Sequence, residues 1–356
     1  MMLYRLLERI DRTTFSPEVV ALLDLGGPIK NRIESLGISV FIVGMKSKLD
    51  LFSIIRLSRY LKENKPDILH TQLFAADVIG RLLGGLHGIP VIITSIRNIY
   101  YGGKLRDLLI KWTDRFAVKT TVVSLYAAKR LQDANIVPGD KLLTIHNGLD
   151  PSDFKLNLED HEINIIRAKL SIPEHHLFIL AVGSLTRQKG YQYLFDALNL
   201  LKSEEINFHL VIAGEGRMQN ELAKLADNLG IETHISFIGH SDEVNKLMAA
   251  ADMLVLSSLW EGLPGVVMEA MASSLPVVAT SVGGTPELIT EGKSGYLVPP
   301  GNPEKLADAL IKMINLSDEE RKKMGQAGRK RVDKYFHINK MVKAYEDLYA
   351  SCMNNK

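Results

Sequence analysis

The sequence predicts an α/β protein of two domains, each a doubly wound parallel sheet with helices on both of its faces. Its 356 residues are more than one hydrophobic core usually serves. Short runs of Val, Ile and Leu alternate with helical patterns through both halves, as they do where crossover helices join parallel strands. A polar stretch at 147–160 separates the two series and indicates a linker.

The first series opens on a helix, because Leu3, Leu6, Leu7 and Ile10 share one helical face. After it, strands are predicted at 18–23, 39–43, 67–70, 91–95, 121–124 and 142–145, and helices at 29–36, 51–63, 76–85, 105–117 and 127–134. The second series has strands near 178–183, 209–214, 235–239, 253–256 and 277–279. We therefore predict domains at 1–160 and 161–335, followed by a helical segment at 336–356.

Composition describes a globular protein, with 46% hydrophobic and 24% charged residues. The only cysteine is Cys352, which excludes an internal disulfide and fits a reducing cytoplasm. No run reaches the roughly 18 apolar residues of a membrane-spanning helix, and the charged first twelve residues do not resemble a signal peptide. The sequence therefore predicts a cytoplasmic protein.

Charge is divided unequally between the halves. Residues 1–150 hold 21 Lys and Arg against 14 Asp and Glu, or +7, and the remainder holds 22 against 27, or −5. A basic half favours an anionic partner, such as a lipid headgroup or a phosphorylated acceptor, although ordinary lysine-bearing helices give the same count. Nucleic acid is not expected as a partner, because the cations are scattered and no aromatic residues are interleaved with them.

Two glutamates eight positions apart, Glu261 and Glu269, carry the clearest signal for a ligand site. The apolar run 253–256 predicts a buried strand, and the Gly-Leu-Pro-Gly turn at 262–265 begins a helix. Glu261 then lies at a strand's carboxyl end, where open α/β sheets bind ligands. Glu269 lies one turn into a helix whose free N–H groups favour a phosphate. Since a carboxylate accepts from two neighbouring hydroxyls, the pattern indicates a nucleotide-sugar; a solvated helix start is the alternative.

This stretch resembles the Glu-x7-Glu signature of the retaining glycosyltransferases of family 4, which have the GT-B fold. The segments 277–287 and 292–299 follow in the family's order and spacing, and the resemblance runs from Met1 to about Tyr349. It implies two Rossmann-like domains that face a cleft, with a C-terminal helix that crosses back to the first, acceptor-side domain. The second domain is the one that the resemblance expects to bind the nucleotide-sugar.

Site residues follow from the same resemblance. Glu261, at the catalytic centre, contacts the donor hexose, and Glu269 contacts the ribose. The remaining donor-binding positions are backbone amides at Gly265, Val266 and Val267, the nucleotide-lining backbone at Gly214, Gly216 and Ile238, and the cations Lys189 and Arg187.

The residues at several of these positions can be compared with the chemistry and the motif expected there. Lys189 follows a buried strand and can reach a diphosphate as a compact positive charge, whereas a solvated loop is the alternative. Ser184 stands where the family commonly has arginine, so Arg187 is expected to supply the second cation. The Gly214-Glu215-Gly216 stretch lacks the third glycine of a dinucleotide fingerprint, because Gln219 occupies that position.

In the first domain, His70 and Arg97 each follow a predicted strand and are candidates for the acceptor side of the cleft. Arg97 stands where related enzymes often place histidine, and a guanidinium binds an oxygen but cannot act as a base. His70 is equally open to a structural role. No metal or other cofactor is expected, because no ligand cluster of suitable spacing is present and Lys189 with a helix N-terminus can balance a diphosphate.

The beginning of the chain departs from the family pattern. Similar enzymes have a strand and a Gly-Gly loop ahead of the segment that matches residues 2–7, and neither precedes it in this sequence. A doubly wound domain should also begin with a strand. Loss of that strand leaves neighbouring strands with unpaired edges. We interpret the sequence as starting downstream of the first strand, in preference to a natural reduction.

Together these features predict a cytoplasmic glycosyltransferase that can contact the membrane peripherally. It is expected to transfer a hexose, with retention, from a nucleotide diphosphate sugar, expected to be a UDP-sugar, to a lipid-linked or surface-polysaccharide acceptor at the inner membrane face. One alternative is a non-catalytic, degenerate subunit that only binds nucleotide. A nucleotide-sugar epimerase of the same fold is another. Transfer or hydrolysis of the donor separates the first two, and epimerisation of free donor identifies the third.

Overall fold

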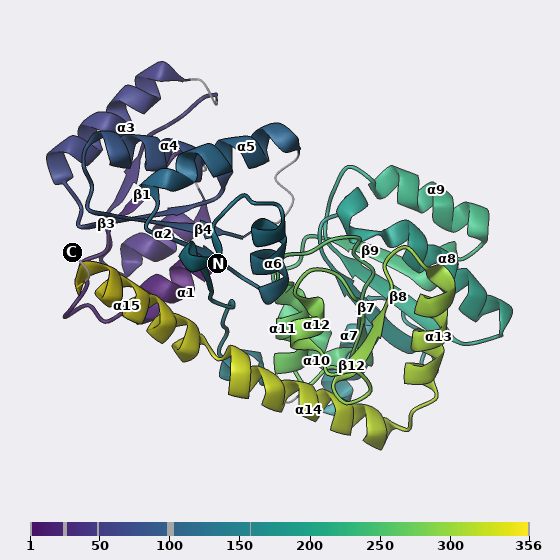
Figure 1. Cartoon of the computed structure of the whole chain (residues 1–356). Helices are drawn as coiled ribbons and strands as arrows, with labels where there is room; N and C mark the ends of the chain where they lie inside the picture. The colour runs from purple at the N-terminus through teal and green to yellow at the C-terminus, as the bar shows by residue number, and fades with distance from the viewer. Residues whose placement is uncertain (1, 24–26, 48–49, 98–102, 157, 355–356) are drawn as a thin grey trace. The chain divides into compact units, whose positions relative to one another are not determined.

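The structure is a computed structural model that describes residues 2–23, 27–47, 50–97, 103–156 and 158–354. It divides into two compact units, unit 1 (Met1–Gly148 with Ile338–Lys356) and unit 2 (Leu149–His337) (Figure 1). The segment 149–160, which we assigned to the first domain from the sequence, therefore lies in unit 2. The reason is local packing, because the short 3-10 helix η3 (Pro151–Phe154) buries Pro151 and Phe154 and contacts helices of that unit.

The strands of unit 1 form two parallel sheets. The smaller sheet pairs β1 (Val19–Ala21) with β2 (Val40–Ile42), and the larger has the order β3-β4-β5-β6. Strands of the larger sheet span Ile68–Gln72, Val91–Ile96, Lys119–Val122 and Leu142–Thr144. Within the described residues no strand pair joins the sheets, so the doubly wound sheet predicted for this half is divided here.

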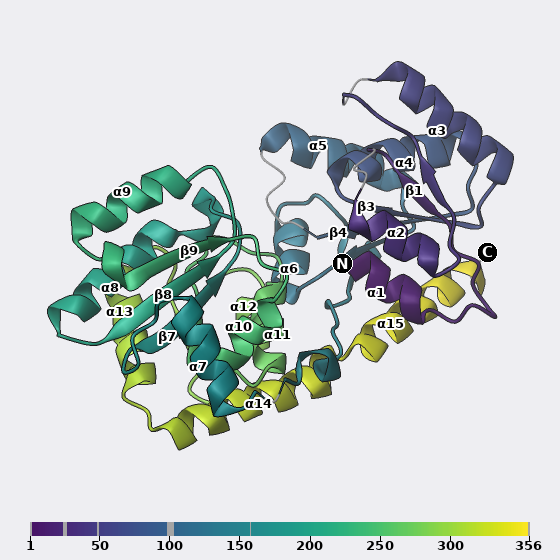
Figure 2. The same ribbon diagram turned by 180° about the vertical axis from the view of Figure 1, so that it is seen from behind.

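Helices cover both faces of the larger sheet in unit 1. On one face, α4 (Phe74–Leu86) packs on β3 and β4, with α3 (Leu51–Asn64) on one side of it and α5 (Lys104–Thr113) on the other. Figures 1 and 2 both show these three helices in a row. The other face is covered by α1 (Met2–Arg9) and α15 (Ile338–Asn354), which share a core with Val91 and Ile93. The remaining helical segments are α2 (Pro28–Ser35), η1 (Asp114–Phe116), α6 (Leu125–Asp133) and η2 (Gly139–Lys141).

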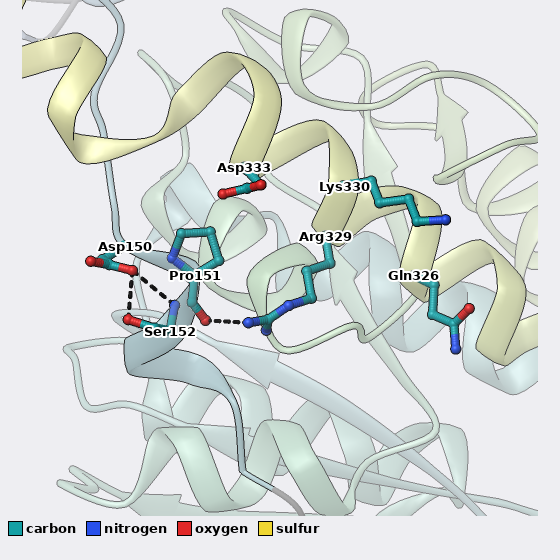
Figure 3. A pocket seen from close by; sticks show the side chains of 7 residues that line it. All are labelled: Asp150, Pro151, Ser152, Gln326, Arg329, Lys330 and Asp333. Atoms are coloured by element: carbon teal, nitrogen blue, oxygen red, sulfur yellow. Dashed lines mark hydrogen bonds between the residues drawn. The ribbon is translucent and has the colours of Figure 1, made fainter.

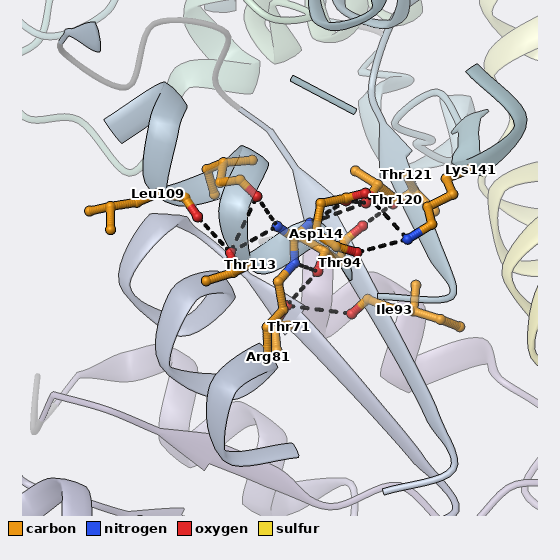
Figure 4. A network of polar contacts seen from close by, with 11 residues as sticks. Thr71, Arg81, Ile93, Thr94, Leu109, Thr113, Asp114, Thr120, Thr121 and Lys141 are labelled. Carbon is orange, nitrogen blue, oxygen red and sulfur yellow. Dashed lines mark hydrogen bonds and ion pairs between the residues drawn. The ribbon is translucent and has the colours of Figure 1, made fainter. Parts of the chain in front are cut away.

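A buried polar network lies among these helices and strands of unit 1 (Figure 4). Arg81 of α4 is 0% exposed and forms an ion pair with Asp114 of η1 at 3.2 Å. The same guanidinium donates to the hydroxyls of Thr94 and Thr120 at 2.8 and 3.1 Å. Lys141 completes the network at 3.4 Å from Asp114. A buried charge is tolerated only where it is paired and hydrogen-bonded, so this network ties α4, η1 and two strands together.

Unit 2 contains one continuous parallel sheet in the order β12-β11-β10-β7-β8-β9. Its strands span Leu177–Val182 (β7), Phe208–Ala213 (β8), Ile235–Gly239 (β9), Met253–Leu256 (β10), Val277–Thr280 (β11) and Gly295–Val298 (β12). Every residue of β8, β10 and β11 is buried, as expected of inner strands covered on both faces. From β7 the chain adds β8 and β9 on one side and then crosses over to add β10 on the other, so the order changes direction between β7 and β10. Such a switch point is where open sheets bind ligands.

Helices cover both faces of this sheet. In the core on one face, α8 (Tyr191–Ser203), α9 (Gln219–Leu229) and α13 (Pro303–Ile314) pack on Ile179 and Ile212. Phe178 and Leu180 alternate with that set and are also fully buried, so the opposite face is covered as well. The remaining helical segments of unit 2 are α7 (Asp160–Lys169), η4 (Arg187–Lys189), η5 (Glu232–His234), α10 (Val244–Ala250), α11 (Gly265–Ala272), α12 (Thr285–Leu288) and α14 (Asp318–Phe336).

Candidate active site

The loops at the carboxyl ends of β7, β8 and β10 bring most of the predicted donor residues together in unit 2. At their centre, Lys189 Nζ lies 2.7 Å from Glu261 Oε1. Both side chains are largely buried, with 16% and 10% of their surface exposed. Ser258 donates a hydrogen bond to the same carboxylate oxygen, also at 2.7 Å. The two residues singled out from separate sequence motifs are therefore direct partners.

Hydrogen bonds between the two loops hold this pair in place. The hydroxyl of Ser257 donates to the carbonyl of Lys189 at 2.8 Å, and the backbone N–H of Leu259 donates to the carbonyl of Gln188 at 2.7 Å. The Gln188 side chain donates to the carbonyl of Trp260 at 2.9 Å. Because these bonds link the loop after β7 to the loop after β10, the ammonium and the carboxylate are positioned before any ligand arrives.

Gly214 and Gly216 have a structural reason to be glycine. A Cβ atom on Gly214 would lie 2.0 Å from the carbonyl oxygen of Gly183, and one on Gly216 would lie 2.3 Å from that of Leu185. The loop after β8 therefore packs with its backbone directly against the loop after β7, which leaves no room for side chains. This close approach explains the Gly-x-Gly spacing without a dinucleotide fingerprint.

Helix α11 begins directly after the loop that carries Glu261. Its N-cap residue, Pro264, provides no side-chain hydrogen bond, so the amides of Gly265, Val266 and Val267 lack a side-chain cap. A Cβ on Gly265 would meet no heavy atom within 4 Å, so the first turn is open on that side. Glu269 lies one turn further along and is partly exposed. An uncapped helix start of this kind favours an anion.

Arg187 and Ile238 lie at the same end of the sheet but outside the central pair. Arg187 is exposed on η4, and its side chain makes no hydrogen bond or ion pair with the part of the chain that the structure describes. Ile238 is in β9, where the carbonyl of the following residue, Gly239, accepts from the N–H of Gly214 at 2.7 Å. Arg187 is therefore available to a ligand, and Ile238 is tied to the Gly214 loop through backbone.

Of the two candidates in unit 1, Arg97 directly follows β4, but His70 lies in the middle of β3, because that strand continues to Gln72 and does not end at residue 70 as predicted. Both ring nitrogens of His70 are engaged, one with the hydroxyl of Tyr349 at 2.7 Å and the other with that of Ser95 at 2.6 Å. Burial, together with the nearby charge of Arg97, lowers the pKa of His70 to about 3. His70 is thus a neutral link between β3, β4 and α15. The Nε of Arg97 is buried and has no hydrogen-bond partner among the described residues.

Sequence reasoning missed Ser258, Ser257 and Gln188, which fix the Lys189–Glu261 pair. Only the Ser-Ser step directly after a buried strand pointed to the two serines, because small hydroxyl residues there commonly bond to nearby backbone and carboxylates. Ser258 is three positions from Glu261, but the contacts of Ser257 with Lys189 and of Gln188 with Trp260 join positions 68 and 72 residues apart, and such pairs follow only from the order of strands in the sheet.

A separate cavity of about 450 Å³ lies between η3 and α14 (Figure 3). Charged and polar side chains line it, and Arg329 bridges to the carbonyl of Pro151 at 2.7 Å. None of the predicted donor residues lines this cavity. It belongs to the packing of η3 on α14 and is apart from the Lys189–Glu261 site.

Among the described residues, no group of three or more His, Cys, Asp or Glu side chains could hold a metal ion. In that same part of the chain, no helix combines the length and the apolar character that crossing a membrane requires.

Comparisons with known proteins agree with this architecture. The family model described as Glycosyl transferases group 1 matches residues 162–331, and the model described as Glycosyltransferase Family 4 matches residues 1–153. A UDP-Gal:alpha-D-GlcNAc-diphosphoundecaprenol alpha-1,3-galactosyltransferase from Escherichia coli is 26% identical over 320 residues, which are 86% of this chain and 81% of that protein. An N-acetyl-alpha-D-glucosaminyl L-malate synthase from Bacillus anthracis is 26% identical over 84% of this chain and 78% of its own length.

Solved structures show the same fold. A glycosyltransferase from Rickettsia africae ESF-5 superimposes with a TM-score of 0.86 at 21% identity, covering 100% of this chain and 95% of its own. Anabaena Alr3699/HepE in complex with UDP gives a TM-score of 0.84 at 20% identity, covering 98% and 95%. Two parallel-sheet units and these matches define a glycosyltransferase with the GT-B fold. The chain belongs to the family 4 glycosyltransferases.

Proposed function

We propose that this glycosyltransferase transfers a hexose, with retention, from a UDP-sugar to a lipid-linked or surface-polysaccharide acceptor at the cytoplasmic face of the membrane. The observation that carries the proposal is the 2.7 Å pair of Lys189 and Glu261 on the loop that leads into the uncapped start of α11. A cation, a carboxylate and free amides in one place suit a ligand that joins a diphosphate to a polyhydroxyl ring.

Each group has a role in this proposal. Lys189, Arg187 and the amides of Gly265–Val267 hold the diphosphate and stabilise the negative charge that grows on it as it leaves. Glu261 accepts hydrogen bonds from hydroxyls of the hexose, and Glu269 accepts from the ribose. We propose that these cations and amides balance the diphosphate without a bound metal, since a lysine and a helix start together provide both charge and donors.

The reaction exchanges one bond for another at the anomeric carbon. The bond from that carbon to the diphosphate oxygen breaks, and the acceptor oxygen forms its bond on the same face through an oxocarbenium-like transition state. The acceptor hydroxyl loses its proton, which the departing diphosphate can take up. Because Glu261 already bonds to Lys189 and Ser258, it is better placed to orient the sugar than to attack it.

The relatives support the choice of donor and acceptor. The Escherichia coli relative is named for a UDP-galactose donor and a diphosphoundecaprenol acceptor, and this chain covers 81% of its length. Anabaena Alr3699/HepE has been crystallised with UDP and with UDP-glucose. These names favour UDP as the carrier and a polyprenyl diphosphate sugar as the acceptor class.

The test is transfer by the full chain from UDP-glucose and UDP-galactose to a polyprenyl-diphosphate-linked N-acetylglucosamine, with the product analysed by NMR. An α-configured product from the α-configured donor supports retention, whereas a β-product overturns it. UDP binding without transfer or donor hydrolysis indicates a nucleotide-binding subunit instead. Epimerisation of the free donor, with no acceptor consumed, identifies an epimerase.

A further inference from the structure

Helix α5 in unit 1 turns an apolar and basic side to solvent. Leu105, Leu108 and Trp112 expose 70%, 60% and 49% of their surface, and their spacing places them on one side of the helix. The other exposed residues of α5 and the following turn are Lys104, Lys111 and Arg115. The guanidinium of Arg115 lies 4.5 Å from the centre of the Trp112 ring, so the cation and the aromatic ring share one surface.

Helix α3 repeats this combination. Leu51, Phe52 and Ile55 expose 69%, 82% and 57% of their surface in its first turns, and the basic residues Arg56, Arg59 and Lys62 follow as exposed positions. The one acidic residue within α3 is Glu63, and the one within α5 is Asp107. We call the exposed apolar and basic residues of the two helices the α3–α5 face.

These two helices belong to one layer. Both contact α4, which lies between them and also packs on β3 and β4 of the sheet (Figures 1 and 2). The six apolar side chains on the two helices are about half or more exposed, although burying each one would stabilise the protein. Scattered single exposed leucines are ordinary, but groups of three on two helices of one layer indicate a surface that another body covers.

Charge selects the occupant. Six cations accompany the six apolar residues of the α3–α5 face, so a second copy of the chain in a two-fold pair would bring like charges together. An anionic lipid bilayer offers what both residue types need, because apolar side chains enter the boundary of the acyl region while lysine and arginine meet headgroup phosphates. Tryptophan is also favoured at that boundary.

We infer that the α3–α5 face docks this protein onto an anionic membrane surface. The inference rests on the proposed function in one respect, since a lipid-linked acceptor requires the enzyme to work at a bilayer. Its physical basis is independent, because it uses only the exposed residues of unit 1. The donor residues all lie in unit 2, so membrane binding and UDP binding can be measured and changed separately.

Vesicle cosedimentation of the full chain tests the inference. The chain is expected to bind vesicles of phosphatidylcholine with phosphatidylglycerol and not vesicles of phosphatidylcholine alone. The double variant Lys104→Gln with Lys111→Gln is expected to bind about 25-fold more weakly, at roughly fivefold for each charge near the surface. Salt at about 1 M should abolish binding, because the screening length falls to about 3 Å.

Matched controls come from unit 2. Lys224→Gln with Lys312→Gln removes two exposed lysines, and Ile165→Gln removes an apolar residue that is 51% exposed. Both should bind vesicles as the unchanged chain does, whereas Leu105→Gln with Leu108→Gln should bind at least tenfold more weakly. All variants should bind UDP with unchanged affinity in calorimetry, which also shows that they are folded.

Fluorescence locates the contact. The chain has two tryptophans, so Trp260→Phe leaves Trp112 as the single reporter. Its emission should shift to shorter wavelength with anionic vesicles and stay unchanged with neutral ones.

Several results would overturn the inference. They are equal binding to neutral vesicles, equal losses in the unit 2 controls, or no shift of Trp112 emission. Light scattering that shows a dimer lost in Leu105→Gln with Leu108→Gln, without a change in vesicle binding, identifies a second copy as the occupant. Equal retention on poly-glutamate identifies an acidic polypeptide. Vesicle binding without UDP binding or transfer leaves the inference standing and removes the proposed function.

Discussion

Unit 2 and unit 1 are both α/β layers, yet they are stabilised differently. Unit 2 has one six-stranded sheet whose inner strands β8, β10 and β11 are buried throughout. Unit 1 has its described strands in two sheets, and all three residues of β1 and of β2 are only partly buried. Unit 1 therefore depends more on side-chain contacts between its elements, and unit 2 depends more on a continuous apolar sheet.

The difference also concerns what each unit does. In unit 2 the loops at the carboxyl ends of the strands are joined by short hydrogen bonds around Lys189 and Glu261, so its site is organised in advance. In unit 1 the buried polar groups His70 of β3 and Arg81 of α4 serve the fold, because their partners are side chains of other elements of the same unit.

The largest expected effect is on the stability of unit 1. Arg81→Met leaves Asp114 buried with Lys141 at 3.4 Å and the hydroxyl of Thr120 at 3.1 Å, and breaking a buried ion pair in this way costs about 3–5 kcal/mol. Urea unfolding followed by Trp112 in a Trp260→Phe background should show the loss, while Trp260 in a Trp112→Phe background should report unit 2 unchanged. Lys141→Met is the control, expected to cost about 1 kcal/mol or less because its partner keeps Arg81. A similar shift of both transitions contradicts the separation of the units.

The next effect distinguishes the roles of Glu261 and Glu269 in unit 2. Glu261→Gln should lower turnover about 10²–10³-fold, as removal of a preorganised polar group at a reacting centre does. It should leave UDP affinity unchanged or higher, because Lys189 no longer shares its charge with a carboxylate. Glu269→Gln should weaken UDP binding, since an amide offers one acceptor oxygen to two ribose hydroxyls. Equal losses of UDP affinity in the two variants would contradict this division of roles.

A pH effect is expected from Asp77 of α4 in unit 1. Its side chain is fully buried, and burial raises the pKa of the carboxyl to about 7, against 3.8 ordinarily, although the charge of Arg81 lowers it. Between about pH 4 and 7 the native state then binds more protons than the unfolded state, so stability falls as pH rises and levels off above 7. Asp77→Asn should remove this slope and stabilise unit 1 at pH 8 by roughly 2–4 kcal/mol, the upper end being about 1.4 kcal/mol for each unit of the pKa rise. The exposed Asp133→Asn is the control, and an unchanged slope in Asp77→Asn contradicts the assignment.

The smallest expected effect concerns UDP binding by unit 2 alone. Because its sheet is continuous and the donor residues all lie within it, a fragment of residues 149–337 should fold and bind UDP within about threefold of the full chain by calorimetry. The Lys189→Met variant of the same fragment provides the control and should bind more weakly. A folded fragment that binds no UDP shows that unit 1 contributes to the donor site.

Much of this fold follows from the sequence because parallel strands leave simple patterns. The run at 253–256 predicts a buried strand, and the structure has β10 at Met253–Leu256. Ends of elements are less certain, since local turns compete with helix. The helix predicted at 105–117 is α5 followed by the 3-10 turn η1, because Asp114 turns inward to meet Arg81.

Site prediction was limited in a different way. Lys189 and Glu261 were each found from a motif, because a cation or carboxylate after a buried strand is visible in sequence. Their contact was not, since it depends on β7 and β10 being neighbours in the sheet. His70 shows the converse problem, because its role comes from Tyr349, a residue 279 positions away. No local pattern contains that information.

The Lys189–Glu261 pair also bears on how the enzyme releases its product. In the proposed mechanism, hydroxyls of the bound sugar donate to the carboxylate of Glu261, and the ammonium of Lys189 turns to the diphosphate. Once the sugar has left, Glu261 has lost those hydroxyls, while the hydroxyl of Ser258 and the ammonium of Lys189 both lie 2.7 Å from its Oε1. Re-forming that pair withdraws positive charge from UDP, so we expect the spent nucleotide to dissociate faster than the intact donor, and each turnover to clear the site for the next.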